Sequence, residues 1–220
     1  MAMEELLHPQ MLLSAYAQGL FPMGQEDGSI RWYRPQQRGV LPIVDFHLPR
    51  RFERWLKGHP FEVRFNTAFG EVMRGCADRE ETWITPAILE AYEALHRLGQ
   101  AHSAEVWRGG SLVGGVYGVS LGAAFFGESM FSRETQASKV ALVHLQRRLR
   151  DRGFLLHDTQ WTTPHLAMFG GHEVPAAVYQ RRLAEALRQT AIFDEDRPPS
   201  FGLVEQDEGD CRGAESVGRD

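Results

Sequence analysis

The sequence contains few cysteines: only Cys76 and Cys211 occur among its 220 residues. Two cysteines so far apart form neither a disulfide framework nor a CxxC metal or redox site. The sequence also has no run of 18 apolar residues and no charged-then-apolar leader, so we expect no membrane span and no export signal. These absences favour a cytoplasmic protein, and 43% apolar residues suffice for an ordinary hydrophobic core.

The loops and clusters that mark several common enzyme classes are missing too. The sequence contains no GxSxG nucleophile turn, no Walker phosphate loop and no GxGxxG motif opening a helix. Its nine histidines show no HExxH or comparable ligand spacing, so we expect no metal site. An enzyme with this sequence therefore needs a substrate that arrives already activated.

Charge is unevenly distributed along the chain. The net charge is −5, but residues 194–220 alone carry nine acidic and three basic side chains. The rest of the chain is close to neutral and can still present a basic face to a nucleic acid. Because residues 194–220 are also rich in proline and glycine, we expect an acidic, disordered tail there.

Hydrophobic periodicity and turn residues predict the helices and strands. We expect helices within residues 1–20 and over 47–57, 68–76, 86–98, 136–150, 164–170 and 175–188. We expect strands over 30–33, 38–42, 61–65, 103–107, 112–119, 123–128 and 154–158.

The break at Gly58-His59-Pro60 predicts a small N-terminal domain, 1–58, followed by a second domain, 61–190. The order of elements from residue 61 favours an α+β fold with a central, mostly antiparallel sheet flanked by helices. This is the element order of acetyltransferase-like (GNAT-type) domains, a likeness of fold that carries no function by itself.

One carboxylate lies in an apolar stretch. Glu128 stands between Phe125-Phe126 and Met130-Phe131. A carboxylate in such surroundings is costly to bury unless it is paired. Glu128 can therefore receive a substrate ammonium group, or it can pair structurally with Arg133 or Lys139, and the sequence leaves both alternatives open.

A second polar pair follows in the segment Leu155-Leu156-His157-Asp158-Thr159-Gln160. Residues two apart on a strand point to the same face, so Asp158 can orient the amide of Gln160, and that amide can align a substrate carbonyl or amine. The alternative is that Asp158 caps the following helix and Gln160 is solvated. His157 and His165 flank this pair, each as a candidate base or as a structural histidine.

The helix expected over 136–150 combines an apolar stripe with basic side chains. Leu142, Leu145 and Leu149 are spaced as a core stripe is, and such a stripe can also floor a pocket. Lys139, Arg147 and Arg148 belong to a charge run that is either a solvated face or a contact for a phosphate backbone.

Seven motifs in one order resemble the leucyl/phenylalanyl-tRNA–protein transferase family, over about residues 5–190. These are YAQGLFPMG, WY-x-P-x-x-RGVLP, TWIT, HSAEVW, LVGGVYGVSLG, FFGESMFS and LLHDTQ. The resemblance implies an enzyme that moves Leu or Phe, and less readily Met, from aminoacyl-tRNA to the α-amine of a protein whose first residue is Arg or Lys. The product enters the N-degron degradation pathway. No cofactor is implied, and we expect a monomer.

The resemblance also implies roles for individual residues. Asp158 and Gln160 fall on the family's D-x-Q pair, where Asp158 holds Gln160 and Gln160 aligns the attacking amine or helps remove its proton. Glu128 would receive the α-ammonium group of the donor or the terminal adenosine, and Trp107 would stack on that adenosine. Lining positions of the apolar pocket fall on Val116, Phe125, Leu142, Leu145 and Leu149.

The chain departs from the family pattern in two places. Met23 stands where many members carry an aromatic residue, so support of the adenine from that side is expected to be a softer contact. The segments 161–165 and 168–171 also differ, which bears on how the acceptor protein is bound. Two rival functions are an acyl-CoA-dependent N-acetyltransferase, against which the missing pyrophosphate loop argues, and a non-catalytic binder of N-terminal Arg or Lys.

Overall fold

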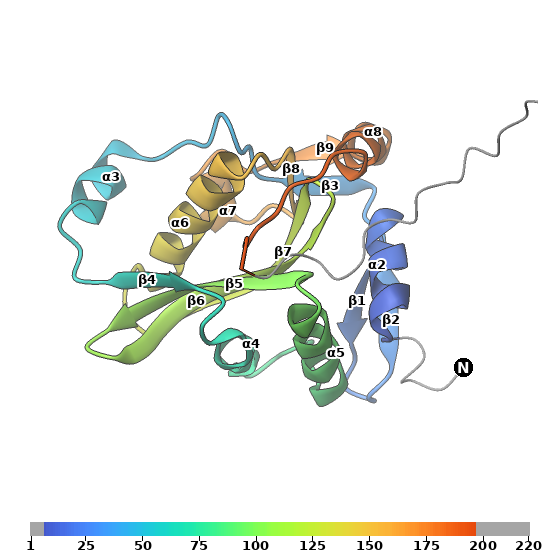
Figure 1. Cartoon of the computed structure of the whole chain (residues 1–220), viewed down its shortest axis with the longest axis horizontal. Helices are drawn as coiled ribbons and strands as arrows, with labels where there is room; N and C mark the ends of the chain where they lie inside the picture. The colour runs from blue at the N-terminus through green and yellow to red at the C-terminus, as the bar shows by residue number, and fades with distance from the viewer. Residues whose placement is uncertain (1–6, 197–220) are drawn as a thin grey trace, which may run out of the picture.

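The computed structural model describes residues 7–196 and is built around one large sheet (Figure 1). Within that range a seven-stranded sheet has the order β4-β5-β6-β7-β8-β3-β9. Its strands are β3 (Gln37–Val40), β4 (Glu62–Phe65), β5 (Ala101–Arg108), β6 (Ser111–Leu121), β7 (Ala124–Ser132), β8 (Leu156–Gln160) and β9 (His172–Pro175). All neighbours are antiparallel except β7 and β8, which are parallel and joined through a helix. The expected α+β fold with a mainly antiparallel central sheet is confirmed.

Strands β5, β6 and β7 form the long antiparallel meander that the glycine turns predict. Gly109 and Gly110 join β5 to β6, and Gly122 lies between β6 and β7. All three have positive φ, a conformation that glycine adopts without the steric cost of a Cβ.

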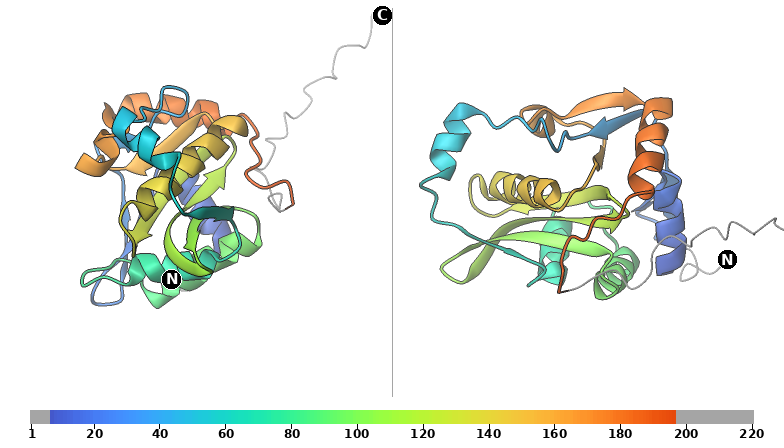
Figure 2. Two further views of the ribbon diagram at one scale, coloured as in Figure 1. Left: turned by 90° about the vertical axis from the view of Figure 1, so that its left-hand side faces the viewer. Right: turned by 45° about the horizontal axis from the view of Figure 1, so that its top comes forward.

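Helices cover both faces of the sheet. One face carries α6 (Ala137–Asp151), which packs on β5, β6 and β7. The opposite face carries α2 (Pro9–Ala17), α4 (Phe69–Ala77), α5 (Pro86–Arg97) and α8 (Ala176–Leu187). Figure 2 shows α2 and α8, from opposite ends of the chain, side by side. Two separate apolar clusters result, one on each face.

The N-terminal segment differs in part from the sequence prediction. No strand was expected over Phe21–Gly24, but this segment forms strand β1, pairs with β2 (Ile30–Tyr33) in a two-stranded sheet and buries Phe21. Strand β3 joins the large sheet, between β8 and β9. The division of the chain into domains 1–58 and 61–190 stays a prediction.

Two local features differ from the sequence prediction. Helix α3 covers only Arg50–Leu56 of the expected 47–57, and its Trp55 is 38% exposed. Strand β9 was not predicted, since it ends in Pro175 and pairs only with β3, which lies far away in sequence.

Helix boundaries elsewhere follow their capping residues. Thr85 and Thr163 accept backbone N–H hydrogen bonds at the starts of α5 and α7 (Pro164–Ala167), each directly before a proline. Gly153 follows the end of α6 with a positive φ. No helix of the described residues is long and apolar enough to cross a membrane. Most of the predicted acidic tail lies beyond residue 196, outside the described residues.

Candidate active site

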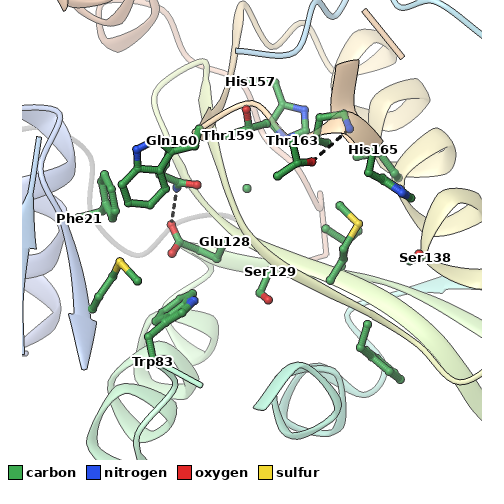
Figure 3. A pocket seen from close by; sticks show the side chains of 18 of the residues that line it. Phe21, Trp83, Glu128, Ser129, Ser138, His157, Thr159, Gln160, Thr163 and His165 are labelled. Atoms are coloured by element: carbon green, nitrogen blue, oxygen red, sulfur yellow. Dashed lines mark hydrogen bonds between the residues drawn. The ribbon is translucent and has the colours of Figure 1, made fainter. Parts of the chain in front are cut away.

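A pocket of about 470 Å³ opens where β7 and β8 separate. The parallel pairing of the two strands ends at Phe126 and Asp158, and residues that follow on both strands line the pocket. Gly127 and Glu128 of β7 lie on one side, and Thr159 and Gln160 of β8 on the other. Figure 3 shows Glu128 and Gln160 between an aromatic end, with Phe21 and Trp83, and an end near Ser138 and His165.

Asp158 and Gln160 have different side-chain partners: Asp158 binds Arg38 and Tyr179, whereas Gln160 reaches Glu128 in the pocket. His157 and Thr159 line the pocket, whereas Asp158 points to the opposite side of the sheet. Gln160 has a φ of +56°, and this left-handed backbone brings its side chain into the pocket as well. The hydrogen bond between the two residues runs from the Gln160 backbone N–H to Asp158 and leaves the side-chain amide of Gln160 free to bind Glu128.

Asp158 is held by three donors and has no exposed surface. Arg38 donates to its two oxygens at 2.8 and 2.6 Å, and the Tyr179 hydroxyl donates to Oδ2 at 2.6 Å. The backbone N–H of Gln160 donates to Oδ1 at 2.9 Å. Asp158 therefore fixes the backbone of Gln160 at the pocket edge and does not cap the helix that follows.

Arg38 is only 1% exposed, which is rare for a charged side chain. Its guanidinium carbon lies 4.8 Å from the ring centre of Phe21 and 4.6 Å from that of Tyr179, and its Nη1 donates to the Gly19 carbonyl at 2.9 Å. Each guanidinium nitrogen thus has an acceptor, as a buried charge requires. Sequence reasoning quoted Arg38 within a motif but assigned it no role.

Glu128 accepts hydrogen bonds from three side chains across the pocket. Tyr16 donates to Oε1 at 2.7 Å, Gln160 donates to Oε1 at 3.2 Å, and Tyr92 donates to Oε2 at 3.4 Å. The Tyr16 and Tyr92 hydroxyls also share a short hydrogen bond. Burial raises the pKa of Glu128 to about 8, against the opposing effect of the Tyr16 hydrogen bond. Glu128 is therefore largely protonated near neutral pH, and a cation in the pocket would favour its ionised form.

The structural pairing considered for Glu128 does not occur. Arg133 instead donates to the Leu112 carbonyl at 3.3 Å and lies over the Phe131 ring. Lys139 lies close enough to His165 to lower the pKa of that histidine, whose burial has the larger effect in the same direction. The carboxylate of Glu128 consequently faces the pocket without a cationic partner among its hydrogen-bonding residues.

The two ends of the pocket differ in chemistry. Met23 lines the aromatic end together with Phe21, Trp83 and Trp161, and the Gly24 N–H donates to the Trp83 carbonyl at 3.1 Å. The other end, near Ser138 and His165, carries a group of apolar side chains. These are Val116, Met130, Leu142 and Leu166.

Some predicted pocket residues lie elsewhere. Phe125, Leu145 and Leu149 are fully buried in the apolar cluster beneath α6 and are not among the residues that line the pocket. Trp107 lies outside the lining as well, on β5, with the guanidinium of Arg64 4.9 Å from its ring centre. Of the leucine stripe, Leu142 alone reaches the pocket.

The three predicted tRNA contacts point in different directions from α6. Arg148 stacks on Phe65 and Phe193, with its guanidinium carbon 4.2 and 5.2 Å from the ring centres. Arg147 lies close enough to His144 to lower its pKa, whereas Lys139 lies near His165. Within the described residues these three cations do not form one stripe on the helix.

Sequence reasoning missed four further residues around the site: Tyr16, Trp83, Tyr92 and Tyr179. Tyr16, Tyr92 and Tyr179 lie on the buried faces of their helices, where a hydroxyl needs a partner. That pattern was visible as tyrosine within apolar stripes, but it does not reveal the partner. Trp83 belongs to the quoted TWIT motif, which marked the position and not its contact with the pocket.

The pocket thus brings a carboxyl group and a side-chain amide together between an aromatic and a largely apolar end. Comparison with known proteins identifies the family. The sequence model of the leucyl/phenylalanyl-tRNA protein transferase family matches residues 40–184, and that of its N-terminal domain matches residues 5–36.

Two curated relatives carry the name leucyl/phenylalanyl-tRNA–protein transferase. The protein of Paramagnetospirillum magneticum is 54% identical over 194 residues, which are 86% of this chain and 93% of the relative. The protein of Ruegeria pomeroyi is 53% identical over 189 residues, 85% of this chain and 90% of the relative. The chain belongs to the leucyl/phenylalanyl-tRNA protein transferase family.

Among solved structures, the crystal structure of FemX is similar in fold. The two share 12% sequence identity and superpose with a TM-score of 0.51, over 74% of this chain and 66% of that one. At this identity the likeness concerns the fold alone.

Proposed function

We propose that this protein transfers leucine or phenylalanine, and less readily methionine, from aminoacyl-tRNA to the α-amine of proteins that begin with Arg or Lys. The observation that carries the proposal is the position of Glu128 and Gln160. They are hydrogen-bonded to each other at 3.2 Å, between an apolar and an aromatic end of one pocket. An aminoacyl ester of adenosine has three parts that match the two ends and the centre of this pocket. Its amino-acid side chain is apolar, its amine lies beside the reactive carbonyl, and its base is flat.

The apolar end would bind the side chain of the donor amino acid. Val116 and Leu142 lie there, and burial of a leucine or phenylalanine side chain contributes about 1.5–3 kcal/mol. The α-ammonium group would then reach Glu128, whose carboxylate ionises on binding because a cation favours the charged form. Tyr16, Tyr92 and Gln160 hold the carboxylate in place for this contact.

The aromatic end would bind the terminal adenosine of the tRNA. Met23 and Trp83 are brought together there by the hydrogen bond between Gly24 and Trp83. A base stacked on tryptophan gains about 1–3 kcal/mol, and a methionine on the other side supplies a softer contact. Trp107, which was expected to stack on the adenosine, lies outside this pocket, so we assign that role to Trp83.

The reaction forms an amide bond and breaks an ester bond. The acceptor α-amine attacks the ester carbonyl carbon, the bond to the ribose oxygen breaks, and the proton lost by the amine leaves with that oxygen. Gln160 aligns the amine and the carbonyl through its side-chain amide. Asp158 is a positioning residue in this scheme, because it is fully buried and its contact with the pocket is the hydrogen bond from the backbone N–H of Gln160.

Other parts of the proposal concern partners and organisation. Lys139 and Arg147 are the proposed tRNA contacts on α6, together with Arg148 if it leaves its aromatic stack. The protein would act as a cytoplasmic monomer and mark its products for N-degron degradation. The helix-flanked sheet supports the GNAT-type description, and the separate β1–β2 sheet supports a small N-terminal unit.

The test is transfer of labelled leucine from Leu-tRNA to a peptide that begins with arginine, without ATP. Wild type should extend that peptide by one residue, and a peptide with an acetylated N-terminus should remain unchanged. Gln160→Ala should lower kcat by ~10²-fold because alignment is lost, while tRNA binding persists. Absence of transfer by folded wild type that still binds the peptide would favour the non-catalytic binder.

A further inference from the structure

His157 forms part of the apolar end of the pocket, although its side chain is polar. It precedes Asp158 on β8 and faces the pocket, opposite to Asp158. Its Nδ1 lies 3.0 Å from Oε1 of Gln146, and Gln146 is on α6 one turn after Leu142, which also lines the pocket. A histidine thus stands beside the cavity that would hold the donor side chain.

The hydrogen-bond chain fixes which ring nitrogen of His157 carries the proton. Gln146 donates its Nε2 to the Pro42 carbonyl at 3.0 Å, so its Oε1 is the atom that meets His157. An amide oxygen only accepts, so Nδ1 must carry the hydrogen and Nε2 must be a bare acceptor. Burial lowers the pKa of His157 to about 4, so this neutral form persists at pH 7.

The bare Nε2 lies toward the pocket-lining strand β7. A Cβ built on Gly127 would lie 2.8 Å from Nε2, so any side chain at this position would cover the ring edge that glycine lets approach. Gly127 lines the pocket as His157 does. Among the described residues, the side chain of His157 is hydrogen-bonded through Nδ1.

A second polar atom on the same wall points to the same kind of ligand. Thr159 lies two residues after His157, on the same face of β8, and lines the pocket. Its buried hydroxyl has no hydrogen-bond partner in the described structure. Among the described residues no hydrogen bond is made by Nε2 of His157 or by the Thr159 hydroxyl, and the buried hydroxyl meets a ligand once its side chain turns toward the cavity.

We propose that His157 and Thr159 recognise a hydroxyl group on the donor side chain, so that the protein also transfers tyrosine. The inference rests on the proposed aminoacyl transfer. Tyrosine has the ring of phenylalanine and one added oxygen, which donates to Nε2 of His157 and accepts from Oγ1 of Thr159. Leucine and phenylalanine fill the same cavity but leave both polar atoms unpaired, and an unpaired buried group disfavours the complex.

The experiment compares transfer from tRNA charged with tyrosine, phenylalanine or leucine to the arginine-initiated peptide. Wild type should transfer tyrosine with a kcat/KM at least equal to that for phenylalanine. His157→Leu should lower the Tyr/Phe ratio of kcat/KM at least about tenfold, and its thermal unfolding transition reports that the variant is folded. His144→Leu is the matched control, because His144 is another partly buried histidine of lowered pKa, outside this pocket.

A second measurement needs no variant. Non-hydrolysable aminoacyl adenosines that carry tyrosine, O-methyltyrosine or phenylalanine should be compared as inhibitors of leucine transfer. The tyrosine form should bind at least about tenfold more tightly than the O-methyl form, which has no hydrogen to donate. Transfer of leucine and phenylalanine without tyrosine would overturn the inference, as would an unchanged Tyr/Phe ratio in His157→Leu. Absence of all three transfers would overturn the proposed function itself.

Discussion

Arg38 and Asp158 form a two-pronged ion pair from which water is excluded, with nitrogen–oxygen distances of 2.8 and 2.6 Å. The pair does not touch the pocket, yet Asp158 also holds the backbone N–H of Gln160, which does. The geometry of the pocket edge therefore depends on a residue 120 positions earlier in the chain.

Replacement of Arg38 by methionine should reduce the free energy of unfolding by about 3–5 kcal/mol, because it leaves the carboxylate of Asp158 buried and unpaired. Denaturant unfolding measures this loss. The double variant Arg38→Met/Asp158→Asn should recover part of it, since no charge then remains. Arg150→Ala, which removes an exposed ion pair with Asp151, is the control and should cost less than about 1 kcal/mol. An equal loss of unfolding free energy in Arg38→Met and in Arg150→Ala would contradict the prediction.

Glu128 should make stability depend on pH. Its pKa is raised from 4.5 to about 8 in the folded protein, so between these values the folded state binds more protons than the unfolded state. The free energy of unfolding should consequently fall as pH rises from about 4.5 to 8. Glu128→Gln removes this contribution. The difference in free energy of unfolding between wild type and Glu128→Gln should change by about 2 kcal/mol over this pH range, after allowance for partial exposure. A difference that stays constant with pH would refute the raised pKa of Glu128.

Tyr16→Phe should move the pH dependence of transfer to higher pH. The Tyr16 hydroxyl donates to Glu128 at 2.7 Å and lowers the pKa of that carboxyl, so its loss leaves Glu128 protonated up to a higher pH. Binding of the donor ammonium group needs the ionised form. A profile of kcat/KM against pH measures the shift. Tyr117→Phe, which removes a buried hydroxyl without a partner, is the matched control and should leave the profile in place.

Gly39→Ala should impair catalysis through the segment after Gln160. A Cβ at Gly39 would lie 2.4 Å from the backbone carbon of Trp161 and 2.7 Å from the nitrogen of Thr162, so this backbone must move. We expect kcat to fall ~10-fold or more, since small displacements of aligning groups are costly. Gly58→Ala has open space around its Cβ and should retain wild-type kcat. Normal turnover by Gly39→Ala would show that Gln160 tolerates the shift.

The sequence predicted most of the fold because its signals are local. Gly109-Gly110, Thr85-Pro86 and the periodicity of α6 each act within a few residues, and each element formed where it was expected. Strands β1 and β9 were missed because their sequences, FPMG and HEVP, contain proline, which disfavours strands, and their pairing partners supply the stabilisation that their own sequences do not.

The sequence motifs predicted which residues belong to the site, but they did not predict which of these residues contact one another. Glu128 and Gln160 were found because a carboxylate and an amide stand out at the ends of apolar runs. The partner of Asp158 could not be read from the sequence, since Arg38 joins it only through the pairing of β3 with β8. Likewise, the i, i+3, i+7 spacing of the leucine stripe does not state which leucine reaches a cavity, because α6 passes from the pocket into the core along its length.

The Tyr179 hydroxyl on α8 has a consequence for synthesis of the protein. Arg38 is made early, but Asp158 and the third donor to its carboxylate, Tyr179, both lie in the last third of the chain. A nascent chain still lacking α8 has an incompletely satisfied buried carboxylate and an open flank beside Arg38. The protein should therefore become active only once nearly all of its chain has left the ribosome. Unfinished chains would then consume no aminoacyl-tRNA.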